Sequence, residues 1–120
     1  MTYFFDTYAI IEIIKENRNY EQHSQEEIIT SLLNFGELYC ALLRDFDEKL
    51  ANEWKERLRG CYLTITENVI VNAMKFKLKN KSKDFSFIDC VGYILAKENN
   101  LKFLTGDKEF KDLDNVEFVK

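Results

Sequence analysis

The stretch from Phe85 to Phe110, FSFIDCVGYILAKENNLKFLTGDKEF, contains two patterns that decide the fold. Between Phe87 and Asn99, apolar residues recur at the three- and four-residue spacing that places them on one side of a helix. These residues are Ile88, Val91, Ile94 and Leu95. The short apolar run Lys102–Leu104 follows and is typical of a buried strand. A helix that leads into a buried strand is a repeating unit of parallel α/β folds.

The same alternation of strand and helix extends outward through the chain. Further strands are expected at Tyr3–Phe5, Ile28–Ser31, Tyr62–Ile65 and Val116–Val119. Further helices are expected at about Thr7–Lys15, Phe35–Arg44 and Asp47–Arg59, and from the cap Thr66 to about Lys79. Short apolar strands between helices favour a parallel sheet that is covered on both faces. The predicted fold is therefore α/β, a three-layer α/β/α sandwich with a central parallel sheet of about five strands.

The composition is that of a globular protein with one domain. The 120 residues are 46% hydrophobic and 32% charged, without a linker or repeat, so residues 1–120 are predicted to form a single domain. The dispersed cysteines Cys40, Cys61 and Cys90 suggest neither a zinc cluster nor a disulfide framework, and we interpret them as small buried residues in a reducing cytosol. A signal peptide and a bilayer-spanning run are both absent from the pattern, so a cytoplasmic location without membrane contact is expected.

One stretch of the chain is strongly basic, although the net charge of the chain is −4. Five lysines alternate shortly before Asp89, namely Lys75, Lys77, Lys79, Lys81 and Lys83. They could form an arm that binds RNA phosphates, which an acidic protein needs locally. They could equally form a solvated helix end, because a spacing of two spreads side chains around a helix. The sequence leaves both interpretations open.

Four carboxylates stand near expected helix starts: Asp6, Glu37, Asp89 and Asp107. Three of these junctions fall at the carboxyl edge of the expected sheet, where ligands bind in such folds. Carboxylate oxygens are the ligands that Mg²⁺ and Mn²⁺ prefer, and a cation would relieve the repulsion within such a set. Each acid alone is more simply a helix cap, and both Asn34-x-x-Glu37 and Ser86-x-x-Asp89 resemble capping boxes. The functional interpretation therefore depends on the set.

Four segments resemble the PIN-domain family, and within it the VapC-type toxins of type II toxin-antitoxin systems. An apolar strand ends in an aspartate and a hydroxyl residue, one helix starts near an aspartate, another holds a glutamate, and a Thr-x-Asp-x-acid-Phe signature follows the late strand. The segments are Tyr3–Thr7, Asn34–Leu38, Phe85–Asp89 and Ala96–Phe110. The resemblance covers almost the whole chain, and the last segment is its most specific part.

The resemblance implies a PIN-like fold and a metal-dependent endoribonuclease. Asp6, Glu37, Asp89 and Asp107 would be both the catalytic residues and the ligands of Mg²⁺ or Mn²⁺, and a metal-activated water would attack an RNA phosphodiester in line. Thr7 and Thr105 would be hydroxyls that orient the carboxylates. The implied partners are the RNA substrate, a small antitoxin protein and a second copy of the chain in a homodimer.

Two residues depart from the family pattern, and two other functions are the alternatives to a ribonuclease. Tyr8 stands where many relatives have a small hydroxyl or amide residue, and Gly106 stands where many have Arg. A receiver-like Mg²⁺-binding signalling module would usually show paired acids after the first strand, and Asp6 stands unpaired. A non-catalytic PIN-like domain that binds RNA or a partner is disfavoured by the complete set of four acids. His23, the single histidine, lacks an accompanying nucleophile motif, so histidine-based catalysis is not expected.

Overall fold

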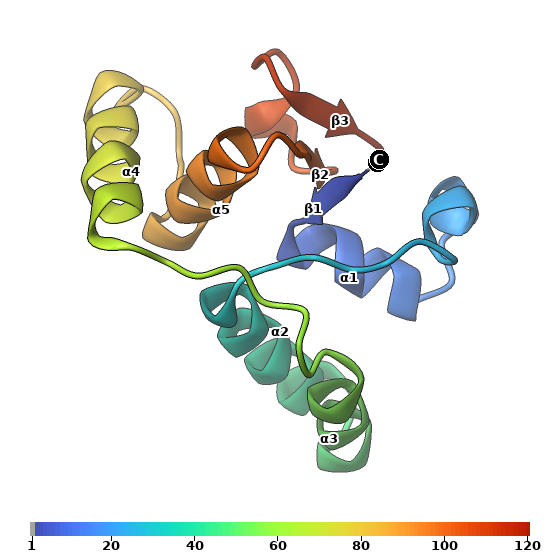
Figure 1. Cartoon of the computed structure of the whole chain (residues 1–120). Coiled ribbons are helices and arrows are strands. Elements are labelled where there is room, and N and C mark those ends of the chain that lie inside the picture. Colours follow the sequence, from blue (N-terminus) through green and yellow to red (C-terminus); the bar gives the residue numbers. More distant parts are fainter. Residues whose placement is uncertain (1) are drawn as a thin grey trace.

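A parallel sheet with helices on both faces forms the centre of the computed structural model, which describes residues 2–120 (Figure 1). The strands are β1 (Tyr3–Phe5), β2 (Lys102–Thr105) and β3 (Val116–Phe118), in the order β1-β2-β3. The helices are α1 (Thr7–Ile14), α2 (Leu32–Asp45), α3 (Glu48–Arg57), α4 (Glu67–Lys79) and α5 (Phe87–Glu98), with the 3₁₀ helices η1 (Arg18–His23) and η2 (Lys108–Phe110). The expected alternation of strands and helices is confirmed.

The sheet has three strands rather than about five, which corrects the predicted strand count. The expected strands Ile28–Ser31 and Tyr62–Ile65 contribute only single parallel bridges, Phe4 to Ile29 and Thr30 to Tyr62. The first segment is short because Ser31 already caps α2, which begins three residues before the predicted start at Phe35. The two segments still extend the sheet beyond β1 by isolated backbone hydrogen bonds, such as the 2.8 Å bond from the Phe5 amide to the Ile29 carbonyl.

The strands separate two hydrophobic cores, as a three-layer sandwich requires. Phe4 and Phe103 point to one side, into a core shared with α4 and α5. Phe5 and Leu104 point to the other side, into a core shared with α1, α2 and α3. Successive side chains of a strand face opposite sides of the sheet, so each strand supplies both cores. The predicted three-layer α/β/α architecture is therefore confirmed, and Figure 1 shows the two helical layers on either side of the strands.

The cysteines and the membrane prediction can be compared directly with the structure. Cys90 is buried as expected, Cys61 is half-buried, and Cys40 is exposed, which corrects the interpretation of that residue. Cys40 follows the buried Leu38 by two positions on α2, a spacing that turns it toward solvent. Within residues 2–120, every helix is too short or too polar to cross a bilayer.

Two helical glycines give a matched test of packing in the α4–α5 layer. A Cβ on Gly92 would lie 3.1 Å from Phe4 Cε1 and 3.2 Å from Phe103 Cε1, and both rings are fully buried. A Cβ on Gly36 in α2 would meet nothing within 4 Å. Alanine in place of a mid-helix glycine stabilises by about 0.5–1 kcal/mol, whereas overpacking a rigid core costs about 1–3 kcal/mol.

We therefore predict that Gly36→Ala raises the free energy of unfolding by about 0.5–1 kcal/mol and that Gly92→Ala lowers it by about 1 kcal/mol. Urea denaturation of the two variants beside the wild-type protein measures both changes. An equal gain for the two variants would show that the Phe4–Phe103 layer can move aside, and the close packing described here would be wrong.

Candidate active site

Asp6 is a buried carboxylate at the carboxyl end of β1, and only 4% of its surface is exposed. It is the N-cap of α1, where its Oδ1 accepts a 2.9 Å hydrogen bond from the Thr7 amide. Its Oδ2 accepts a 2.7 Å hydrogen bond from Thr105 Oγ1 at the end of β2. Since β1 and β2 are parallel and adjacent, their carboxyl ends meet and place these groups together. Both carboxylate oxygens are thus fixed.

Asp107 and Glu37 approach this point from β2 and α2. The Asp107 amide donates to Thr105 Oγ1 at 3.1 Å, so Thr105 connects Asp107 with Asp6. Glu37 lies in the second turn of α2, and its Oε1 accepts a 2.7 Å hydrogen bond from Thr7 Oγ1. Two threonine hydroxyls therefore hold two of the four predicted acids, Thr105 holding Asp6 and Thr7 holding Glu37.

Asp89 faces the other acids from the first turn of α5 and also caps that helix. Its Oδ2 accepts a 2.9 Å hydrogen bond from the Ser86 amide, and its own amide donates to Ser86 Oγ at 3.0 Å. The predicted capping box at this helix is therefore confirmed. The second predicted capping box, Asn34-x-x-Glu37, is wrong because Ser31 is the N-cap of α2 and Asn34 occupies its third position.

Burial and mutual repulsion raise the pKa values of three of the four acids. The pKa of Asp6 is raised to about 7, mainly by burial and also by the charges of Asp89 and Glu37, although the hydrogen bonds from Thr105 and Thr7 act to lower it. Burial also raises the pKa of Glu37, as does the charge of Asp89. The pKa of Asp89 is raised by burial and by the charge of Asp107. Asp89 therefore interacts with each of the other three acids.

The set is acidic without compensation. In the part of the chain that the structure describes, no Lys, Arg or His forms an ion pair with any of the four carboxylates. Nor does any group of three or more His, Cys, Asp and Glu side chains within residues 2–120 form a ready metal site. The negative charges of the acids repel one another. The donor types and the missing positive charge fit a hard divalent cation.

The two departures from the PIN pattern, Tyr8 and Gly106, are in contact with each other. A Cβ on Gly106 would lie 2.3 Å from Tyr8 Cε1 and 2.4 Å from the Val119 carbonyl oxygen, so any side chain there would collide with both. The Tyr8 ring therefore fills the space beside the backbone that leads from Thr105 to Asp107. Burial raises the pKa of the Tyr8 hydroxyl, and the charges of Glu12 and Asp107 add to the effect.

The predicted lysines divide between α4 and the turn that follows it. Three of them, Lys77, Lys81 and Lys83, line a hollow of about 350 Å³ together with Met74 and Leu78. The ammonium group of Lys77 donates to the Phe85 carbonyl, just before the start of α5. The turn is also tied to the segment after Asp107, because the Asp84 amide donates to Glu109 Oε1 at 3.2 Å. The basic turn is thus in contact with the residues just before α5 and with η2, which follows Asp107.

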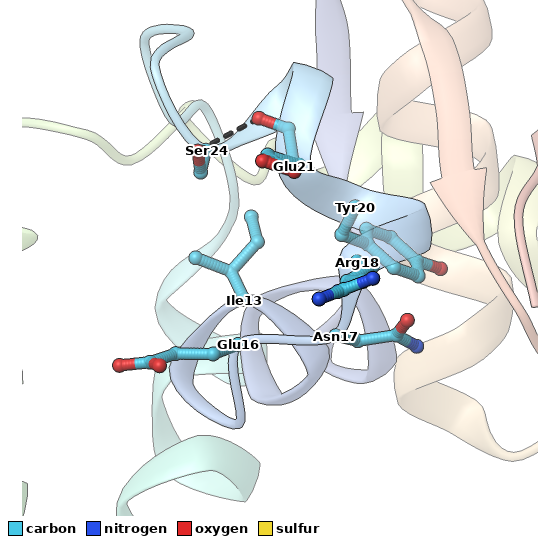
Figure 2. A pocket seen from close by; sticks show the side chains of 7 residues that line it. All are labelled: Ile13, Glu16, Asn17, Arg18, Tyr20, Glu21 and Ser24. Carbon is cyan, nitrogen blue, oxygen red and sulfur yellow. Dashed lines mark hydrogen bonds between the residues drawn. The ribbon is translucent and has the colours of Figure 1, made fainter.

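A second hollow contains none of the predicted site residues. Figure 2 shows it beside the end of α1 and η1, where it encloses about 290 Å³. It is lined by Ile13, Glu16, Asn17, Arg18, Tyr20, Glu21 and Ser24. Asp6 caps the opposite end of α1, so this hollow is separated from the acids by the length of that helix. His23 lies nearby in η1, where it is buried and its Nδ1 contacts Glu26 Oε1 at 2.7 Å.

The site includes one residue that sequence reasoning missed as a functional candidate. Asn34 is fully buried, and its Nδ2 donates a 3.0 Å hydrogen bond to Thr7 Oγ1. In the sequence it was interpreted only as the start of a capping box. The signal available was a polar residue three positions before Glu37, which places both on the same side of a helix.

The fold and the site together define a three-layer α/β protein with a set of acids where the strands of a parallel sheet end. The family model of the PIN domain matches residues 3–116. The chain therefore belongs to the PIN-domain family. No curated protein sequence matches it.

Several solved structures share the fold over nearly their whole length. A toxin-antitoxin complex from Klebsiella pneumoniae has a TM-score of 0.78 at 17% identity, covering 97% of this chain and 96% of its own. VapC20 of Mycobacterium tuberculosis, a toxin that cleaves the sarcin-ricin loop, has a TM-score of 0.80 at 15% identity, covering 99% of this chain and 100% of its own. VapBC-1 from nontypeable Haemophilus influenzae has a TM-score of 0.71 at 22% identity, covering 98% and 96%. The PIN-like fold expected from the sequence is thus confirmed.

The raised acid pKa values predict that the metal-free protein loses stability as the pH rises from about 4 to about 7. Folded Asp6 keeps its proton up to a pH of about 7, whereas an unfolded Asp releases it near 3.8. Between these two pH values the folded state binds more protons than the unfolded state. The free energy of unfolding therefore falls as the pH rises. Glu37 and Asp89 shift in the same direction.

Thermal denaturation in a chelator across this pH range measures the effect, with Asp6→Asn as the comparison. The variant should show a shallower fall in Tm because it lacks the group with the pKa of about 7. Identical pH profiles for the variant and the wild-type protein would show that Asp6 titrates normally in the folded state.

Proposed function

We propose that this chain is a Mg²⁺- or Mn²⁺-dependent endoribonuclease and the toxin of a toxin-antitoxin pair. The single observation that carries the proposal is the buried carboxylate of Asp6, which faces further acids and has no cationic partner among the described residues. Burying a charge is costly unless an opposite charge compensates it. The buried Asp6 carboxylate therefore lowers the stability of the protein unless a bound ligand supplies the positive charge that compensates it.

A divalent cation would be held by the carboxylates of Asp6, Glu37, Asp89 and Asp107. When bound, such an ion lowers the pKa of a water and stabilises negative charge on phosphate and leaving oxygens. The protein's own residues orient the acids for this purpose. Thr105 donates to Oδ2 of Asp6, and Thr7 donates to Oε1 of Glu37. Each donation favours the ionised form of its carboxylate, which is the form that binds a cation.

RNA is the proposed substrate, and the lysines between α4 and α5 are its proposed phosphate contacts. Lys77, Lys81 and Lys83 gather around one hollow beside the turn that leads to Asp89. These three lysines are the preferred candidates among the five because they share one hollow, whose lining does not include Lys75 and Lys79. A protein with a net charge of −4 needs such a local patch to attract a polyanion.

The proposed protein partners are a small antitoxin and a second copy of the chain, acting in the cytoplasm. Support for the antitoxin comes from the structural neighbours, which include a toxin-antitoxin complex and two VapBC structures. The homodimer is proposed on the family resemblance.

The central test exchanges single carboxylates for amides. Asp6→Asn and Asp89→Asn should each abolish Mg²⁺- or Mn²⁺-dependent cleavage of RNA, because an amide lacks the charge that holds the cation. The metal-free variants should melt at the same temperature or higher, since fewer charges repel one another and Asn caps a helix about as well as Asp. Gel-based cleavage assays and thermal denaturation measure the two effects.

Asp47→Asn is the matched control, because Asp47 caps α3 with a 2.9 Å hydrogen bond to the Leu50 amide on an exposed surface. It should leave cleavage unchanged. Retained cleavage with a lowered Tm in the Asp6 and Asp89 variants would mean that these acids serve only as caps.

The basic patch is tested by its salt dependence. Replacing Lys77, Lys81 and Lys83 by Gln should weaken RNA binding and reduce the slope of log affinity against log salt by about 2, because each phosphate contact to a single strand contributes about 0.7. The control replaces Lys49, Lys55 and Lys102, which have the same total charge but lie on α3 and at the start of β2. Equal slopes for the two triple variants would favour the solvated helix end.

A further inference from the structure

A chain of buried hydrogen bonds runs from the start of α2 to Glu37. Ser31 Oγ donates to Asn34 Oδ1 at 2.6 Å, and Asn34 Nδ2 donates to Thr7 Oγ1 at 3.0 Å. Thr7 Oγ1 then donates to Glu37 Oε1 at 2.7 Å. Ser31 and Asn34 are fully buried, and Thr7 is 8% exposed, so water does not compete for these groups.

The chemistry of the groups gives this chain one direction. An amide nitrogen can only donate, so the Thr7 hydroxyl must accept from Asn34 and keeps its own proton for another acceptor. The Thr7 hydroxyl has two acceptors within reach, Glu37 Oε1 at 2.7 Å and the backbone carbonyl oxygen of Asn34 at 3.4 Å. The shorter contact to an ionised oxygen is the stronger one. Asn34 Nδ2 thus donates to the Thr7 hydroxyl oxygen, and the Thr7 hydroxyl proton is donated to Glu37 Oε1.

Asp6, which directly follows β1, accepts a hydrogen bond from a threonine that is fixed in the same way. Thr105 Oγ1 accepts from the Asp107 amide at 3.1 Å and donates to Asp6 Oδ2 at 2.7 Å. The N–H group that donates to Thr105 belongs to the backbone of Asp107. The N–H group that donates to Thr7 belongs to the side chain of Asn34, so a single substitution removes it.

We propose that Asn34 is a positioning residue that fixes the Thr7 hydroxyl so that it holds the Glu37 carboxylate ready for a divalent cation. The inference rests on the proposed function and names a residue outside the four acids that the metal site requires. Its effect passes through Thr7, because the Asn34 side chain bonds to Thr7 and Ser31 and the structure shows no hydrogen bond from it to an acid.

Asn34 also has a structural role in α2, from which the proposal must be separated. Its backbone amide donates to Ser31 Oγ at 3.1 Å and so helps to cap the helix. Replacement by leucine or alanine keeps that amide, and a residue important only for packing would change stability without changing metal affinity. Metal affinity therefore distinguishes the two roles.

The experiment is a double-mutant cycle read by Mn²⁺ binding to the metal-free full-length protein. Asn34→Leu keeps the size of the side chain and removes its donor, and Thr7→Val removes the hydroxyl. Each should weaken Mn²⁺ binding, measured by titration calorimetry, by about tenfold, the lower end of what the loss of a ligand-orienting group costs. The double variant should bind no more weakly than Thr7→Val, because both changes break the same path.

Catalysis gives a second reading of the same variants. Asn34→Leu should lower kcat for RNA cleavage by about tenfold while KM for the RNA stays within about twofold, because the substrate contacts are untouched. Thr7→Ser keeps the hydroxyl and should retain Mn²⁺ affinity close to that of the wild-type protein. Asn34→Ala, which places less strain on the core, should shift affinity in the same direction if the leucine variant does not fold.

Thr30→Val is the matched control, since it removes a buried 2.8 Å hydrogen bond from Thr30 Oγ1 to the Phe5 carbonyl on a neighbouring segment. It should lower Tm and leave Mn²⁺ affinity unchanged. Asn34 variants that lose stability but bind Mn²⁺ normally, or effects that add fully to those of Thr7→Val, would overturn the inference. A wild-type protein that binds no Mn²⁺ would instead overturn the proposed function.

Discussion

The pairing of β1 with β2 is the constraint on which the rest of the site depends. The register sets Phe5 beside Leu104, and the Asp6 amide donates to the Leu104 carbonyl at 3.0 Å. Beyond this point the chain enters α1, while Thr105 reaches across to the Asp6 carboxylate. Phe5 and Leu104 are fully buried in the core beneath α1, α2 and α3, so the Asp6 backbone has little freedom to move. A buried carboxylate is thus held in place by hydrophobic packing.

The charges of Asp89 and Glu37 act on the Asp6 carboxylate, and Asp107 is linked to it through Thr105. Asp6 and Asp89 cap α1 and α5, and a helix N-terminus stabilises a negative charge through the peptide dipoles. This partial stabilisation is exceeded by burial, since the pKa values of both acids are raised. Capping and metal binding are therefore compatible uses of one carboxylate. In the proposed function, the repulsion that destabilises the metal-free set would also favour the binding of a cation.

Much of the fold could be predicted from the sequence, because apolar periodicity and strand-to-helix junctions are local signals. The same junctions pointed to the four acids, whose role as metal ligands stays a prediction. The helix Phe87–Asn99 and the strand Lys102–Leu104 were predicted within one residue. The segment around Ile29 was not, because residues 28–31 have an apolar start typical of a strand while Ser31 already caps α2. The role of Asn34 depends on Thr7, which lies 27 positions away. The packing of Tyr8 over Gly106 likewise arises only when distant segments meet.

The decisive question is whether the acids bind one divalent cation together, and a crystal structure of the protein with Mn²⁺ answers it. The anomalous scattering of manganese locates the ion independently of its ligands. We expect a peak with oxygen atoms of Asp6 and Asp89 at roughly 2 Å, the contact distance of small hard cations. Manganese bound only at other surface carboxylates, with Asp6 still hydrogen-bonded only to Thr105 and the Thr7 amide, would contradict this proposal.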